Sequence, residues 1–252
     1  MLNVRKALAG ILISGLLPMA VANADTVFGI YVGVGTWQQE YSGDVVSGIS
    51  SVDIEDDLGL DDDDNAIFYA AFEHGVPLLP NIRVQHFSLD VDGRSVLSRT
   101  IEFNGQVFPI TDAVSTVVDL SQTDAVFYYE LLDNVVSLDL GLAISRLEGE
   151  LEVASSFDRA SADFDEVIPM IYVKARVDLP LTGLWAGVEA QGISYDDDSL
   201  LEFNAQLGYE SDIGLGIEVG YRAVQIEFDA FDDVDNAEID VSGPYAAINY
   251  HF

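Results

Sequence analysis

Few side chains in this sequence can serve as a general base, because it has three histidines and no cysteine. His74 precedes an expected tight turn and His251 is the penultimate residue, whereas His86 is followed closely by Ser88 and Asp90. Serine, histidine and aspartate can act together in nucleophilic catalysis, but residues of one strand cannot form a triad without partners from other strands. GxSxG and HExxH motifs are absent. We therefore predict that the protein is not an enzyme.

Clustered carboxylates are the second group that could do chemistry. The segment 42–65 holds nine acidic residues and no basic residue. Hard cations prefer carboxylate oxygens, which makes part of this segment a candidate site for Ca²⁺ or Mg²⁺. The candidate ligands are Asp56, Asp57, Asp61, Asp62, Asp63 and Asp64. The EF-hand spacing is absent, so a solvated, self-repelling loop is the competing interpretation. Divalent cations bridging the loops to lipid phosphates, and adaptation to high salt, stay open as well.

The overall composition joins strong acidity to high hydrophobicity. The 252 residues carry a formal net charge of −34, yet 49% of them are hydrophobic and 10% are aromatic. Disordered acidic chains are poor in aromatic residues, so a folded protein is expected. Recognition of nucleic acid requires clustered lysine and arginine, and this chain has only 10 of these residues in total. Nucleic acid is therefore excluded as a partner.

The first 24 residues have the features of a secretory signal peptide. Arg5 and Lys6 are followed by an apolar stretch from Ala7 to Val21 and by the small residues Ala22-Asn23-Ala24. The apolar stretch is short for a transmembrane anchor, which is the alternative interpretation. We expect residues 1–24 to be removed and a single domain to span residues 25–252. Loss of the two basic residues changes the charge from −34 to −36.

The mature chain shows a period of two, in which apolar residues alternate with small or polar ones. This alternation predicts ten strands, near residues 28–35, 68–73, 82–85, 124–131, 136–145, 171–178, 184–191, 202–210, 215–222 and 245–252. The expected connections form two alternating sets. One set is mostly long, at 42–65, 90–117, 149–165, 195–199 and 229–240. The other set consists of tight turns at 77–81, 133–134, 180–183 and 211–214. An even number of strands with short turns at one end is typical of an antiparallel, up-and-down outer-membrane β-barrel.

Charged residues on the polar side of these strands indicate an enclosed lumen. Nine acidic and four basic side chains share this side, a balance of −5. They are Glu73, Arg83, Asp124, Glu130, Asp139, Lys174, Arg176, Asp178, Glu189, Glu202, Glu210, Glu218 and Arg222. Placing the few basic residues opposite carboxylates is expected where desolvation makes unpaired charges costly. Tyr129, Tyr209 and Tyr221 on the apolar side suit interfacial aromatic girdles.

The chain ends in Asn249-Tyr250-His251-Phe252, a strand with a terminal phenylalanine. This ending resembles the C-terminal signature that delivers outer-membrane barrels to the barrel-assembly machinery. The stretches 53–60 (DIEDDLGL), 77–81 (PLLPN), 192–196 (GISYD) and 220–222 (GYR) resemble a family of Gram-negative outer-membrane β-barrel proteins of unassigned activity. The resemblance implies an outer-membrane location and an assembly signal at Tyr250 and Phe252. It implies no catalytic residues.

From these observations we expect a monomeric ten-stranded transmembrane barrel in contact with outer-membrane lipid and lipopolysaccharide. Its function is expected to be structural or that of a narrow, cation-preferring pore, because barrels near eight strands have interiors filled by side chains. The alternatives are an adhesion or binding protein acting through its acidic loops and, less favoured, a lipid-modifying enzyme. A secreted, soluble acidic β-protein is the alternative at the level of the fold.

Overall fold

The computed structural model describes residues 28–47, 50–196, 198–231 and 234–252. The expected signal peptide lies outside these residues. Within the described ranges, no helix is long and apolar enough to cross a membrane.

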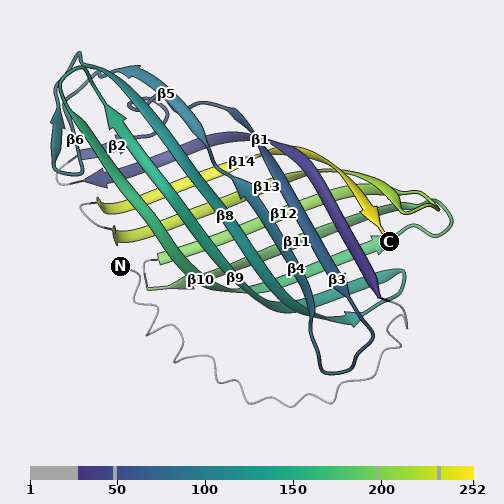
Figure 1. Ribbon diagram of the computed structural model, residues 1–252. Helices are drawn as coiled ribbons and strands as arrows, with labels where there is room; N and C mark the ends of the chain where they lie inside the picture. Colours follow the sequence, from purple (N-terminus) through teal and green to yellow (C-terminus); the bar gives the residue numbers. More distant parts are fainter. Residues whose placement is uncertain (1–27, 48–49, 197, 232–233) are drawn as a thin grey trace.

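In the described part of the chain, ten antiparallel strands form one closed sheet, in which each strand pairs with its neighbours and β1 pairs with β14 (Figure 1). They are β1 (Gly29–Ser47), β3 (Asp63–Glu73), β4 (Asn81–Ser88), β8 (Ala113–Leu132), β9 (Val136–Ala154), β10 (Arg159–Asp178), β11 (Leu184–Tyr195), β12 (Asp198–Glu210), β13 (Leu215–Phe231) and β14 (Val234–His251). Each of the ten predicted strands has its counterpart here. The predicted up-and-down barrel is confirmed.

Four shorter strands lie at the end of the barrel opposite the tight turns (Figure 1). They are β2 (Ser50–Asp53), β5 (Val91–Val96), β6 (Ile101–Phe103) and β7 (Gln106–Phe108). β2 extends the edge of β1 and β5 that of β8, while β6 and β7 form a separate hairpin. These strands occupy the expected long connections 42–65 and 90–117.

Two predicted loops were wrong, because the residues 149–165 and 229–240 lie largely in strands. β9 runs to Ala154 and β10 begins at Arg159, so only a four-residue turn separates them. In this turn the Ser155 backbone N–H donates to the Asp158 carbonyl oxygen at 2.8 Å. The outward side chains of these strand ends are charged rather than apolar, which is why the alternation was missed.

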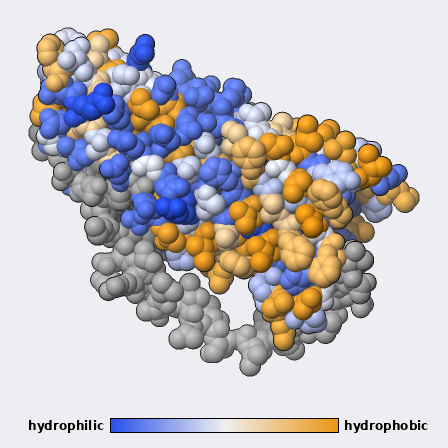
Figure 2. Space-filling view, in the orientation of Figure 1, coloured by the Kyte–Doolittle hydropathy of each residue, from blue (hydrophilic) through white to orange (hydrophobic). Residues whose placement is uncertain are grey.

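The apolar face changes sides part of the way along the strands. On β1, Val32 and Val34 point outward and are exposed, whereas Trp37, Tyr41 and Val45 point inward and are buried. Figure 2 shows the resulting band of apolar surface at the end near the C-terminus and a hydrophilic surface at the β5 and β6 end. The barrel therefore has two sections with opposite polarity inside and outside.

We name these two parts the belt section and the projecting section. The belt section, with an apolar outer face, comprises 28–34, 66–72, 82–84, 125–131, 136–144, 167–177, 184–190, 201–209, 215–223 and 246–252. The projecting section comprises the described residues of 36–65, 86–123, 146–165, 192–200 and 225–243. On β9 the belt covers nine residues, Val136–Ile144, which is about the length of a tilted membrane-crossing strand.

The hydrophobic core fills the projecting section. Trp37, Phe87, Leu58, Phe103 and Phe108 are each 0% exposed. They come from two barrel strands and from the segments around β2, β6 and β7, so the short strands close this end of the barrel by packing on its interior. The polar interior of the belt section lies directly below this core.

Candidate functional site: the charged interior of the belt section

The structure places all thirteen predicted lumen charges on the inner face of the barrel, in two groups. One group is a buried network beneath the hydrophobic core, and the other lines a cavity at the end with the tight turns. The first contains Asp124, Glu189, Glu202 and Arg222. The second contains Glu73, Arg83, Glu130, Asp139, Lys174, Arg176, Asp178, Glu210 and Glu218.

Two carboxylates and one guanidinium form the centre of the network. Arg222 Nη2 donates to Glu202 Oε2 at 2.6 Å, and both side chains are less than a tenth exposed. The amide of Gln191 bridges the two carboxylates, donating to Asp124 Oδ2 at 2.7 Å and to Glu202 Oε1 at 2.8 Å. Gln122 also donates to both of them. Buried carboxylates require such donors, because each unsatisfied oxygen loses its hydration without compensation.

Neutral amides were missed as members of this site. Gln85 donates to Asp124 at 2.6 Å, and Gln85, Gln122 and Gln191 are all buried. A search for charged residues could not find them. The sequence feature that could have revealed them is a glutamine on the inward-facing side of each of three strands, β4, β8 and β11.

Arg222 also joins the network to the hydrophobic core. Its guanidinium carbon lies 4.1 Å from the centre of the Phe87 ring and 5.4 Å from that of Trp37. Asp124, Gln122, Trp37 and Phe87 are all 0% exposed. The barrel interior at this level is therefore packed with side chains.

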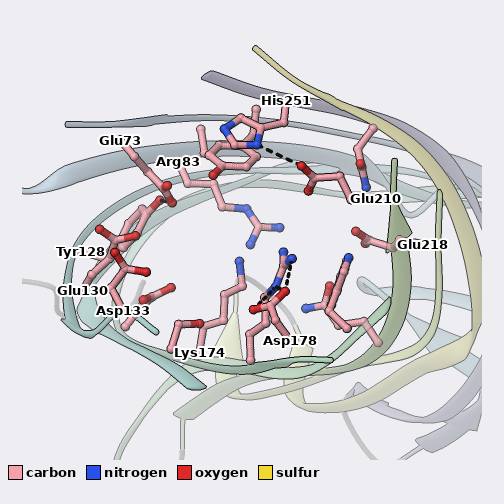
Figure 3. Close-up of a pocket in the computed structure, with 18 of the residues that line it drawn as sticks. Glu73, Arg83, Tyr128, Glu130, Asp133, Lys174, Asp178, Glu210, Glu218 and His251 are labelled. Atoms are coloured by element: carbon pink, nitrogen blue, oxygen red, sulfur yellow. Dashed lines mark hydrogen bonds and ion pairs between the residues drawn. The ribbon is translucent and has the colours of Figure 1, made fainter. Parts of the chain in front are cut away.

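The cavity of about 280 Å³ lies below the network (Figure 3). Its lining includes Asp133 in the turn between β8 and β9, Asp178 at the end of β10, and Glu210 and His251 near the ends of β12 and β14. Because these residues lie at the strand ends beside the tight turns, the cavity is at that end of the barrel. Seven acidic and three basic side chains line it, besides His251.

Most of the basic groups in the cavity have partners. Arg83 pairs with Glu189 and stacks on Tyr69 at 5.1 Å. Arg176 pairs with Asp178 at 2.7 Å and lies over the Trp185 ring at 4.3 Å. Among the described residues, by contrast, Lys174 forms no ion pair. Figure 3 shows the Arg83 and Lys174 side chains extending toward the middle of the cavity.

The histidines do not share a site. His86 points outward and contacts the Thr123 hydroxyl at 2.9 Å on β8. His251 lies 3.2 Å from Glu210 and stacks on Tyr31 at 4.0 Å between ring centres. His74 precedes the turn to β4, where its backbone N–H donates to Asn81. The residues Ser88, His86 and Asp90 thus lie along one strand end, as their spacing alone would place them.

The acidic segment 53–64 uses its carboxylates to stabilise turns. Asp53 Oδ1 accepts the backbone N–H groups of Glu55 at 3.0 Å and Asp56 at 2.7 Å. Asp57 is buried and pairs with Arg99. Asp61 and Asp63 accept the N–H groups of their successors Asp62 and Asp64. Across the described residues, no three acidic or histidine side chains are grouped so that they could hold a metal ion.

Several aromatic residues lie at the ends of the belt. Tyr250 and Phe252 pack edge to face at 4.5 Å, and the Phe252 N–H donates to the Ile30 carbonyl oxygen at 2.9 Å, which ties the C-terminus to β1. Tyr209 and Tyr221 point outward and are exposed, at opposite ends of the apolar band.

A closed barrel with an apolar outer belt and a charged interior defines the class of outer-membrane β-barrel folds. Comparison with solved structures supports this fold. The chain is similar to the outer membrane protease OmpT from Escherichia coli, with a TM-score of 0.54 and 13% identity over 89% of this chain and 96% of that chain.

Two further similar structures have lower TM-scores. The attachment invasion locus protein Ail of Yersinia pestis has a TM-score of 0.37 and 12% identity, over 89% of this chain and 99% of that chain. Neisserial surface protein A has a TM-score of 0.34 and 12% identity, over 88% of this chain and 97% of that chain. No family model and no curated protein matches the sequence.

Proposed function

We propose that this chain is an integral protein of the Gram-negative outer membrane, neither an enzyme nor an open pore, whose closed barrel holds a rigid acidic structure above the lipid. The observation that carries this proposal is the reversal of polarity between the belt and projecting sections. An exposed apolar band around the whole barrel needs a lipid environment, since soluble proteins expose apolar patches of only a few hundred Å². The projecting section, with its polar outer face, belongs in water.

The outward side chains of β9 offer a direct test. Leu140 is 42% exposed in the middle of the belt, whereas Glu150 is exposed in the projecting section of the same strand. In lipid vesicles, Leu140→Arg should destabilise the folded barrel by about 2–4 kcal/mol, because a charge near the bilayer midplane is desolvated. Glu150→Arg is the matched control and should cause no such loss. Equal stability of the two variants, or a chain that stays soluble without detergent, would refute the membrane location.

The packing of the interior supports a closed barrel over the narrow, cation-preferring pore that composition suggested. The buried network and the hydrophobic core fill the interior one above the other. Planar-bilayer recording should therefore show no steady conductance. If channels open, their ion selectivity tests the alternative of a cation-preferring pore. Cation preference would agree with an acidic lumen, whereas anion preference would contradict it.

The absence of catalysis is part of the proposal. One of the similar solved structures is that of a protease. In this chain, however, His86 faces outward and His251 lies at the opposite end of the barrel, near the tight turns. Neither histidine is therefore placed beside a nucleophile in the interior of the barrel at its external end. Incubation of the folded protein with peptide and phospholipid substrates should give no hydrolysis above that of the boiled protein.

Surface binding is a second candidate function, favoured by the outer face of the projecting section. Acidic residues lie directly opposite one another across β8, β9 and β10, as in the row Asp119, Glu150 and Asp163. This face begins at the edge of the belt, at the level of lipid headgroups. We propose lipopolysaccharide as its partner, with Ca²⁺ or Mg²⁺ bridging carboxylates and phosphates, and a monomeric protein. Neutralising this row with Asp119→Asn, Glu150→Gln and Asp163→Asn should abolish lipopolysaccharide binding but not assembly, because all three side chains are exposed. Unchanged binding by the triple variant would refute this face as the binding element.

A further inference from the structure

The cavity at the turn end of the barrel holds charges that the fold itself leaves unbalanced. On β8 and β9, Glu130 and Asp139 are directly opposite each other. Glu73 is close enough to interact electrostatically with both of them. Like charges at directly opposed positions destabilise a sheet, so this acidic wall is unfavourable unless something positive lies against it.

Asp139 is the clearest sign of a missing partner. It is 5% exposed and lines the cavity, and Lys174 on the neighbouring strand interacts with it electrostatically, yet its buried Oδ1 atom has no hydrogen-bond partner. The other carboxylates nearby are better satisfied, since Glu73 accepts the Tyr128 hydroxyl at 2.7 Å. A buried carboxylate oxygen without a donor is rare in native proteins, because nothing replaces its lost hydration.

A positive charge without a direct ion pair lies next to this wall. Lys174 is opposite Asp139 on one side and Glu189 on the other, and it interacts electrostatically with both, but it forms no ion pair in the described part of the chain. Its side chain extends toward the middle of the cavity, as does that of Arg83, while Glu73, Glu130 and Asp133 lie together on one side (Figure 3). The cavity therefore presents negative charge at its wall and positive charge at its centre.

From this arrangement we infer that the cavity binds a small zwitterionic solute of amino-acid size, with its ammonium group against Asp139 and Glu130 and its carboxylate toward Lys174. The volume of about 280 Å³ is near the lower end of small-molecule sites. Seven acidic against three basic lining residues favour a solute with a second ammonium group. The inference rests on the proposed membrane location: short turns of outer-membrane barrels face the periplasm, so the solute enters from that side.

Isothermal titration of the full-length, detergent-solubilised protein with L-lysine tests the inference. Cadaverine, which lacks the carboxylate but carries the greater positive charge, is the comparison ligand. We expect L-lysine to bind more tightly than cadaverine, although simple attraction to an acidic cavity predicts the reverse. No heat with millimolar L-lysine, or tighter binding of cadaverine, would overturn the inference.

Three variants separate the contacts from the net charge. Asp139→Asn should weaken L-lysine binding by about tenfold or more, and Lys174→Met should do so for L-lysine but not for cadaverine. Glu218→Gln changes the cavity charge equally, but Glu218 already accepts the hydroxyl groups of Tyr69 and Tyr245 at 3.0 Å and 2.7 Å, so its effect should be small. Equal losses in Asp139→Asn and Glu218→Gln would contradict the assigned contacts.

Folding is checked independently by migration of the unheated protein on a gel. If Asp139→Asn fails to fold, Glu130→Gln replaces it with the same expected loss. Because binding is measured in detergent, its failure would leave the proposed membrane location intact. Conversely, a stable Leu140→Arg variant would refute that location without affecting the titration.

Discussion

Removal of the buried guanidinium of Arg222 should strongly destabilise the barrel. This side chain is 8% exposed and pairs with the buried carboxylate of Glu202, which shares the Gln191 amide donor with the buried carboxylate of Asp124. Arg222→Met retains the apolar contacts with Phe87 and Trp37 but leaves Glu202 without its ion pair. Loss of one partner of a buried pair lowers the free energy of unfolding by about 3–5 kcal/mol.

The double variant Arg222→Met/Glu202→Gln tests whether the uncompensated charge causes this loss. A glutamine at position 202 can still accept from Gln122 and Gln191 through its carbonyl oxygen and carries no charge. Its remaining deficit should be near the cation–π energy of a desolvated arginine, about 2 kcal/mol. The double variant should therefore be more stable than Arg222→Met alone.

Urea unfolding in detergent micelles is the appropriate assay, followed by tryptophan fluorescence. The chain has two tryptophans, and Trp37 lies beside the Arg222 guanidinium, so the signal reports on this region. Gel migration without heating gives the folded fraction independently. A loss below about 1 kcal/mol in Arg222→Met, or a double variant as unstable as the single one, would refute the reasoning.

Three further predictions concern the projecting section. Glu150→Lys places a positive charge between Asp119 and Asp163 and should stabilise the barrel by about 0.2–1 kcal/mol for each pair, an effect that urea unfolding should show diminishing at high salt. Burial, and to a lesser extent Asp119, raises the pKa of the Asp90 carboxyl. The folded form then holds this proton more tightly than the unfolded form does. The free energy of unfolding should therefore fall as the pH rises from about 3.9, the pKa of an unperturbed Asp, through the higher pKa of Asp90 in the folded protein. Asp90→Asn should abolish this part of the pH profile. Millimolar Ca²⁺ should raise the melting temperature if the acidic segments bind metal, and an unchanged melting temperature would exclude such binding.

Much of the barrel could be predicted from the sequence because its cause is local. Alternation with a period of two decides which side chains share a face, and proline, glycine, asparagine and aspartate specify the tight turns. These signals predicted ten strands, the turns at 133–134 and 211–214, and the inward placement of charges such as Arg83 and Glu218. Each inference needed only residues that are neighbours along the chain.

The extent of the strands and the division of the interior could not be predicted in this way. At the outer ends of β9 and β10 the apolar face turns inward, so residues 149–165 looked like an acidic loop. Whether a carboxylate is paired depends on register: Asp57 meets Arg99, 42 positions away, and Arg83 meets Glu189, 106 positions away. No short segment of sequence contains both members of such a pair.

The strong acidity and high hydrophobicity of the chain illustrate this difference. Composition and alternation by themselves determined that apolar and charged residues occupy opposite faces of a closed sheet. Only the tertiary structure decided where those faces exchange, which charges neutralise one another, and that Asp139 and Lys174 face a cavity without ion-pair partners of their own. The reason is physical, since the energy of a charge depends on what surrounds it in space, whereas the period of a strand depends only on its backbone.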